Sequence, residues 1–410
     1  MTATRWPETV LGTHCERVTV GHVGPMADQY LSAGVPFLRS QDINPFSIAT
    51  DGVKFIGAAF DTKLRKSRLR AGDVAIVRTG YPGTAAVVPR ELDGANCADL
   101  VILTPGAHLD PWYAAALFNS AWGKGQVGGV LVGVAQQHFN VGAAKAMRVR
   151  LPPFPEQQAI GSIIKSYSDL IETNQRRNAI LEEMARRLFE EWFVRFRYPG
   201  HDSETLVETD LGSTPEGWNR TAAGELIEFD PRTRVEKEGV KTFVPMGSLS
   251  TTSIAISEWE TRSGNSGAKF QNGDTLLARI TPCLENGKTG YVDFLGANET
   301  AFGSTEYIVM RGRSVPATFV QLLARSERFR AAAIGSMGGS DGRQRARAEA
   351  LEKFELAAPP KPLIDQFDQV VAPMFKAVRC LTDQNTRLRA ARDLLLPKLI
   401  SGEIEVGAIA

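Results

Sequence analysis

The feature that most constrains the fold is a pair of proline clusters, each followed by a long heptad pattern. The clusters occupy residues 151–155 and 358–362, and the second begins 207 residues after the first. Proline ends a preceding helix but is tolerated in a helix's first turn, so each cluster marks the start of a helix. The pattern after the first cluster, in alternating steps of four and three, is Ile160, Ile164, Tyr167, Ile171, Asn174, Asn178, Leu181, Ala185, Leu188 and Trp192. Adding 207 to each number gives Phe367, Val371, Met374, Val378, Leu381, Asn385, Leu388, Arg392, Leu395 and Leu399.

Alternating steps of four and three are the spacing of a coiled-coil seam. Each helix would span about 38 residues, or roughly 57 Å, whereas a typical globular helix has about 11 residues. Asn178 and Asn385 fall at equivalent seam positions, where a buried amide fixes the register because mispairing leaves it unsatisfied. We therefore predict that the two helices pair as an antiparallel coiled coil. The alternative is that each helix packs only on its own globular domain.

The segments before the two helices are also related. Residues 70–79 and 271–280 both predict a Gly-Asp turn that leads into an apolar strand, and the strands end at Arg78 and Arg279. The fold class is therefore α+β, with two globular domains that are each followed by a long helix. The predicted domains are residues 1–150 and 216–357, the proline clusters with their helices are 151–198 and 358–410 (the latter with a C-terminal tail), and the linker is 199–215.

The composition limits the class of protein. The 47 Lys and Arg residues are balanced by 46 Asp and Glu, which argues against a general polybasic coat but permits local basic patches. No apolar run approaches the roughly 18 residues of a membrane span, and the first residues lack a signal-peptide layout. The four cysteines are far apart and form no zinc-binding pattern with histidine. We expect a cytoplasmic multidomain protein with no metal and no membrane association.

Catalytic motifs are absent or incomplete in the sequence. Residues 287–289 resemble the end of a phosphate loop, but Pro282 stands where the loop needs its first glycine. Residues 338–342 match a nucleophile elbow, yet the last histidine is His201, which precedes the serine. We therefore predict that the chain is not an enzyme.

Two globular domains on a helical pair suit a ligand with two separated sites, and DNA presents half-sites about 34 Å apart. A basic run at residues 63–70 holds five cations, and arginine or glutamine can read base edges. The candidate DNA-contacting residues are Lys63, Arg65, Lys66, Arg68, Arg78, Thr79, Tyr81, Gln136, Gln137, Arg279, Thr281, Lys288, Ser340, Arg343 and Arg345. The alternatives are that the cations form a solvated face and that Arg78 and Arg279 pair with carboxylates at strand ends.

Several stretches resemble the specificity (S) subunit of type I restriction-modification enzymes. They are residues 273–288 and 304–307, the two proline clusters with their helices, and residues 394–404. The resemblance implies that two target-recognition domains read the halves of an asymmetric bipartite DNA site. It also implies that the helices dock two methyltransferase (M) subunits, which carry S-adenosylmethionine. Restriction (R) subunits would bring ATP and Mg, so this chain would hold no cofactor. The competing hypothesis is a coiled-coil scaffold that joins proteins without reading DNA.

Overall fold

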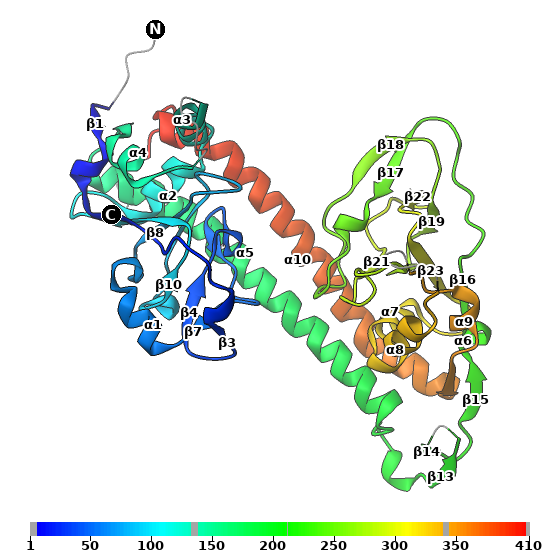
Figure 1. The fold of residues 1–410 in the computed structure, drawn as a ribbon. Coiled ribbons are helices and arrows are strands. Elements are labelled where there is room, and N and C mark those ends of the chain that lie inside the picture. Colours follow the sequence, from blue (N-terminus) through cyan, green and yellow to red (C-terminus); the bar gives the residue numbers. More distant parts are fainter. Residues whose placement is uncertain (1–5, 133–137, 211, 339–343, 407–410) are drawn as a thin grey trace. The chain divides into compact units, whose positions relative to one another are not determined.

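The computed structural model describes residues 6–132, 138–210, 212–338 and 344–406 (Figure 1). The chain divides into two compact units. The first unit comprises Met1–Glu172 and Arg387–Ala410, and the second unit comprises Thr173–Thr386. The boundary falls within the two long helices, α5 (Phe154–Phe189) and α10 (Lys361–Ser401), so each unit contains one end of each helix.

The main sheet has the same topology in both units, with four strands and only antiparallel neighbours. In the first unit the order is β2 (Cys15–Val20), β11 (Leu100–Pro105), β8 (Val74–Val77) and β9 (Ala85–Val87). In the second unit it is β16 (Ile227–Phe229), β23 (Tyr307–Gly312), β20 (Thr275–Ala278) and β21 (Thr289–Tyr291). All four residues of β8 and of β20 are buried, as expected for the apolar strand that follows each Gly-Asp turn.

A second sheet in each unit is built around one parallel strand pair. In the first unit the order is β10 (Asn96–Cys97), β4 (Val35–Leu38), β7 (Lys54–Ile56) and β3 (Tyr30–Leu31), with β10 parallel to β4. In the second unit it is β18 (Glu260–Ser263), β17 (Val240–Val244), β22 (Thr300–Gly303) and β19 (Ala268–Gln271), with β17 parallel to β22. β4 corresponds to β17, and their antiparallel neighbours β7 and β18 also correspond. The remaining strand lies beyond β7 in the first unit (β3) but beyond β22 in the second unit (β19). The duplication is therefore not exact in this sheet.

The remaining helices and short strands of the two units also correspond. The first unit has α2 (Pro111–Asn119), α3 (Ala121–Val132), α4 (Val141–Ala146) and a ribbon of β1 (Glu8–Val10) with β12 (Arg148–Arg150). The second unit has α7 (Ala317–Arg325), α8 (Glu327–Gly335), α9 (Ala348–Glu352) and a ribbon of β15 (Asn219–Ala222) with β24 (Glu355–Ala358). The smaller elements are α1 (Ala58–Lys63), β5 (Ile43–Asn44), β6 (Ser47–Ile48) and α6 (Ala223–Leu226). A hairpin of β13 (Leu206–Thr209) and β14 (Gly212–Pro215) lies within the predicted linker.

The two ribbons carry the same ion pair with reversed polarity. In the first unit Arg148 Nε donates to Glu8 Oε1 at 3.0 Å. In the second unit Arg220, at the position of Glu8, pairs with Glu355, at the position of Arg148. The duplicated lobes therefore retain the ion pair while exchanging its charges.

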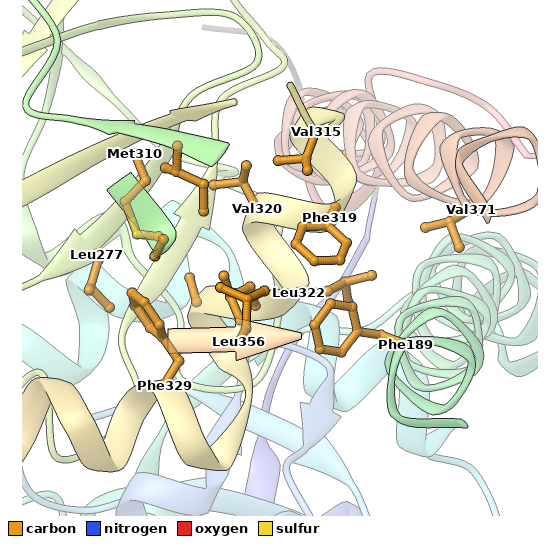
Figure 2. Close-up of a cluster of buried hydrophobic side chains, with 14 of the residues drawn as sticks. Phe189, Leu277, Met310, Val315, Phe319, Val320, Leu322, Phe329, Leu356 and Val371 are labelled. Atoms are coloured by element: carbon orange, nitrogen blue, oxygen red, sulfur yellow. The ribbon is translucent and has the colours of Figure 1, made fainter. Parts of the chain in front are cut away.

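The core of the second unit gathers around the ends of α5 and α10. Phe319 of α7 lies with its ring centroid 5.3 Å from that of Phe189 on α5, and Val371 of α10 belongs to the same cluster (Figure 2). Trp192 and Phe367 also meet, with centroids 5.6 Å apart. The ends of α5 and α10 that lie in this unit are thus buried against its aromatic side chains.

The first unit buries the opposite helix ends in its own core. Ile160 and Ile164 of α5 and Leu396 and Leu399 of α10 belong to one cluster together with Tyr113 of α2. In the second unit Asn174 bonds Asn385 while Asn178 bonds Thr382, so residue numbers rise along α5 as they fall along α10. The predicted antiparallel pairing is therefore present there, whereas the supercoiling of a coiled coil stays a prediction.

Within the described residues, no helix combines the length and apolar character that a membrane crossing needs.

Candidate nucleic-acid interface

Each Gly-Asp turn is held by a buried aspartate that accepts hydrogen bonds from an arginine on another strand of the same sheet. In the second unit Arg311 of β23 donates from Nε and from a terminal nitrogen to the two oxygens of Asp274, at 2.6 and 2.7 Å. In the first unit Arg17 of β2 donates to Asp73 at 2.7 Å, and the Thr104 hydroxyl adds a 2.6 Å bond. These charge-assisted bonds fix the starts of β20 and β8, whose other ends carry Arg279 and Arg78.

In the second unit, four of the predicted DNA-contacting residues gather at the end of β20. The backbone N–H of Ala346 donates to the carbonyl of Arg279 at 2.8 Å, and that of Thr281 donates to Gln344 at 3.4 Å. These bonds place Arg345 beside the strand end, and Lys288 lies opposite because the N–H of Ala278 donates to its carbonyl at 3.1 Å. The structure therefore brings together Arg279, Thr281, Lys288 and Arg345.

Two of these four side chains are engaged by protein acceptors. Arg345 donates to both oxygens of Glu306, at 2.8 and 2.6 Å, and this bidentate bond raises the pKa of Arg345. The Lys288 ammonium donates to the carbonyl of Met246 at 3.1 Å. A base contact by Arg345 therefore stays a prediction, and it requires Glu306 to share or release the guanidinium.

In the first unit, Arg78 and Thr79 occupy the equivalent strand end. The backbone N–H of Phe139 donates to the carbonyl of Arg78 at 3.3 Å, as Ala346 does to Arg279. The hydroxyl of Thr79 lies 3.0 Å from Nδ1 of His138. Tyr81 is 84% exposed, so its ring is available to a ligand.

The two strand-end arginines share a feature that Arg379 also shows. In the part of the chain that the structure describes, Nε of Arg78 and Nε of Arg279 are buried and have no hydrogen-bond partner. Arg78 also lies 3.5 Å from Asp99, which supports the alternative that it is structural. A buried donor without a partner costs about 1–3 kcal/mol, so an acceptor supplied by a ligand would stabilise either arginine.

The basic run at residues 63–70 separates into paired and unpaired cations. Arg68 forms an ion pair with Asp61, and Arg70 lies 3.0 Å from Glu16. The exposed side chains of Lys63, Arg65 and Lys66 form no ion pair with any described residue. The latter three are the cations best placed to contact phosphates.

Four predicted DNA-contacting residues, Gln136, Gln137, Ser340 and Arg343, lie outside the described residues. The segments that follow them are anchored alike, by the bonds from Phe139 to Arg78 and from Ala346 to Arg279.

The two predicted register residues lie in the helix pair, but they do not meet each other. Nδ2 of Asn174 donates to Oδ1 of Asn385 at 3.0 Å, and Nδ2 of Asn178 donates to the hydroxyl of Thr382 at 3.1 Å. Each amide therefore faces the opposite helix with a specific polar partner, which fits a role in register.

The sequence did not indicate the polar contacts that tie the second unit's loops to its helices. Glu182 of α5 accepts from the Ser253 hydroxyl at 2.6 Å, and burial raises the pKa of this carboxyl. Arg379 of α10 lies 3.1 Å from Asp293 and donates to a backbone carbonyl at 2.9 Å. Burial raises the pKa of Asp293 to about 6, against the attraction of Arg379.

We expect Asp293 to make the stability of the second unit depend on pH. Because the folded-state pKa of Asp293 lies above its ordinary value of 3.8, the folded chain binds an extra proton between about pH 4 and pH 6. The stabilising contribution is therefore present at low pH and lost as pH rises through 6. Asp293→Asn should remove about 2 kcal/mol of this pH dependence, measured by urea unfolding at pH 4.5, 6 and 7.5. Parallel profiles for the two proteins would contradict the assignment.

Among the residues that the structure covers, no three His, Cys, Asp or Glu side chains gather to hold a metal ion.

The duplicated sheets and the long helices define an α+β protein of two similar units, and comparison with known proteins identifies its class. No protein-family model matches the chain. The S subunit of a type I restriction-modification system from M. genitalium has the same fold, with a TM-score of 0.58, 12% identity and 97% coverage of both chains.

The curated relatives are specificity subunits of type I restriction enzymes. The MjaIX subunit of Methanocaldococcus jannaschii is 25% identical over 274 residues, covering 64% of this chain and 62% of that relative. The EcoAI subunit of Escherichia coli is 25% identical over 277 residues, covering 65% of this chain and 44% of the relative. Less than two thirds of either relative is matched. The resemblance predicted from the sequence is confirmed: the chain is a homologue of type I restriction enzyme specificity subunits.

Proposed function

We propose that this chain is the non-catalytic DNA sequence-specificity subunit of a type I restriction-modification complex. Each lobe would read one half of an asymmetric bipartite site. The observation that carries the proposal is that equivalent strand ends present Arg78 and Arg279, each with a buried Nε that has no acceptor among the described residues. Different residues follow the two arginines, Thr79 after Arg78 and Ile280 after Arg279, so the two half-sites should differ in sequence.

The partners belong to the same proposal. Double-stranded DNA would lie against the two strand ends, two M subunits would dock on the helical pair, and R subunits would join that complex. S-adenosylmethionine would be held by the M subunits, and ATP with Mg by the R subunits. Ile180 and Met184 on α5 are 60% and 47% exposed, and such apolar side chains on a helix suit a protein contact.

Footprinting tests the proposal directly. The chain with its M subunits should protect two short tracts of one sequence, separated by an unread gap. The competing scaffold hypothesis predicts equal affinity for all duplexes or none, because a scaffold has no base contacts. A bipartite adenine-methylation motif that disappears from the genome when this chain is deleted would independently support the proposal.

We expect the unpaired cations of the basic run to contribute affinity without specificity. Replacing Lys63, Arg65 and Lys66 with alanine should weaken binding to every duplex equally. The slope of log K against log salt should become shallower by about 0.9 for each phosphate that the variant no longer neutralises. Fluorescence anisotropy over a salt series measures this slope. Lys165→Ala is the control, because Lys165 is engaged by Asp169 at 2.5 Å. A change in sequence preference would show instead that the run reads bases.

A further inference from the structure

The first unit contains a cavity of about 700 Å³ that the proposed DNA contacts do not use. It lies between α3, α4, the β1–β12 ribbon and the C-terminal end of α10. Its walls are mainly apolar, and the lining includes Leu117, Trp122, Val127, Phe139, Met147 and Ile400. Trp122 is 39% exposed there, although tryptophan is usually largely buried.

The second unit fills the corresponding place with its own aromatic side chains. Ile400 corresponds to Phe193, 207 residues earlier, and Met147 precedes β12 as Phe354 precedes β24. The ring of Phe193 lies 5.1 Å from that of Phe319 and 4.8 Å from that of Phe367. The cavity therefore exists where the first unit has smaller side chains in place of aromatic rings.

At a third position the first unit has a glycine where the second unit has an aromatic ring. Gly123 and Phe329 both lie three residues after a serine whose hydroxyl accepts their N–H, Ser120 at 3.0 Å and Ser326 at 3.4 Å. Phe329 packs 5.2 Å from Phe354. A Cβ at Gly123 would lie 2.1 Å from the backbone oxygen of Leu117, so backbone occupies this position in the first unit.

The polar groups of the cavity limit what it can bind. The Ser120 hydroxyl donates to a backbone carbonyl at 2.7 Å, and that of Ser401 does so at 3.2 Å. Glu8 and Arg148 are paired with each other. Arg150 is exposed and forms no ion pair with the described residues. The amide of Gln126 also lines the cavity. Because the walls are mainly apolar and Arg150 has no ion pair with the described residues, an apolar group beside a carboxylate would suit this cavity.

We propose that this cavity is a docking site for a partner polypeptide that inserts an aromatic side chain and places a carboxylate next to Arg150. We assign the aromatic group to a polypeptide because side chains of the protein itself fill the corresponding place in the second unit. The cavity exceeds the volume of a single ring, so neighbouring residues of the partner would enter with it. The inference does not depend on the proposed DNA reading.

A fluorine NMR titration of the full chain tests the site. The probe is an acetylated Gly-Phe-Asp-Gly amide with 4-fluorophenylalanine, and saturable line broadening is expected. The double variant Met147→Phe with Ile400→Phe copies the second unit and should weaken binding at least about fivefold by filling the cavity. Leu394→Phe is the matched control, because it adds a ring to α10 at a position that is 70% exposed and should leave binding unchanged.

A second variant keeps the test independent of core packing. Arg150→Gln should weaken the Phe-Asp peptide about threefold, as for an exposed charge pair, and leave a Phe-Asn peptide unchanged. The proposal is overturned if the filled variant binds the peptide as well as the natural chain does. It is also overturned if thymidine or free 4-fluorotoluene binds as well as the peptide does, since these outcomes would indicate a base or a small apolar ligand.

Discussion

Replacing Asp274 with alanine should lower the free energy of unfolding of the second unit by about 3–5 kcal/mol, because it leaves a partly buried arginine without its carboxylate. Asp274 is 0% exposed and accepts two bonds from Arg311 and one from the backbone N–H of Gln271. It thus links the turn before β20 to β23. Urea unfolding of the full chain, followed by circular dichroism, measures the loss.

The first unit offers a matched control for this prediction. Glu16→Ala breaks the pair with Arg70, whose two side chains are both more than half exposed, and should change stability by at most about 1 kcal/mol. Changing Asp274 and Arg311 together to apolar residues should recover part of the loss, because no buried charge is then left unpaired. Equal effects of Asp274→Ala and Glu16→Ala would show that the buried pair does not hold the turn.

The fold was largely predictable because its signals are local. The proline clusters, the heptad ladders and the two Gly-Asp turns each specify an element within a short window, and their repetition specified the duplication. The partner of Asn385 was not predictable in the same way. Repeat equivalence relates Asn385 to Asn178, whereas antiparallel pairing places it against Asn174, since facing positions depend on where the helices cross.

The candidate site was only partly predictable, because carboxylates far away in the sequence decide what each arginine does. The strand ends at Arg78 and Arg279 follow from the Gly-Asp turns. Glu306, which engages Arg345, and Asp99, which lies beside Arg78, stand just before the neighbouring strands β23 and β11. Their pairing depends on sheet order, which no local pattern contains. For the same reason, the sequence did not show that Arg311 and Arg17 pair with the turn residues Asp274 and Asp73.

Inserting four residues into α5 after Asn178 should abolish sequence-specific DNA binding and M-subunit assembly. The insertion adds about 6 Å and rotates everything after it by about 40°. Within the second unit, Ala185 and Phe189 would leave the seam while Asn174 kept its bond to Asn385. Co-purification with M subunits and footprinting of the natural site measure the two losses.

A variant with a compensating insertion in α10 tests whether the helical pair sets the distance between the half-sites or only joins the two units. Asn178 faces Thr382, so four residues inserted between Leu381 and Thr382 lengthen α10 at the position opposite the first insertion. The double insertion should restore pairing on both sides. If the helical pair sets the distance between half-sites, the preferred gap should then grow by about two base pairs, since 6 Å spans nearly two steps of 3.4 Å. Methylation-motif sequencing of cells that carry each variant measures the gap. Restored assembly with the original gap would mean that the helices join the lobes without measuring DNA.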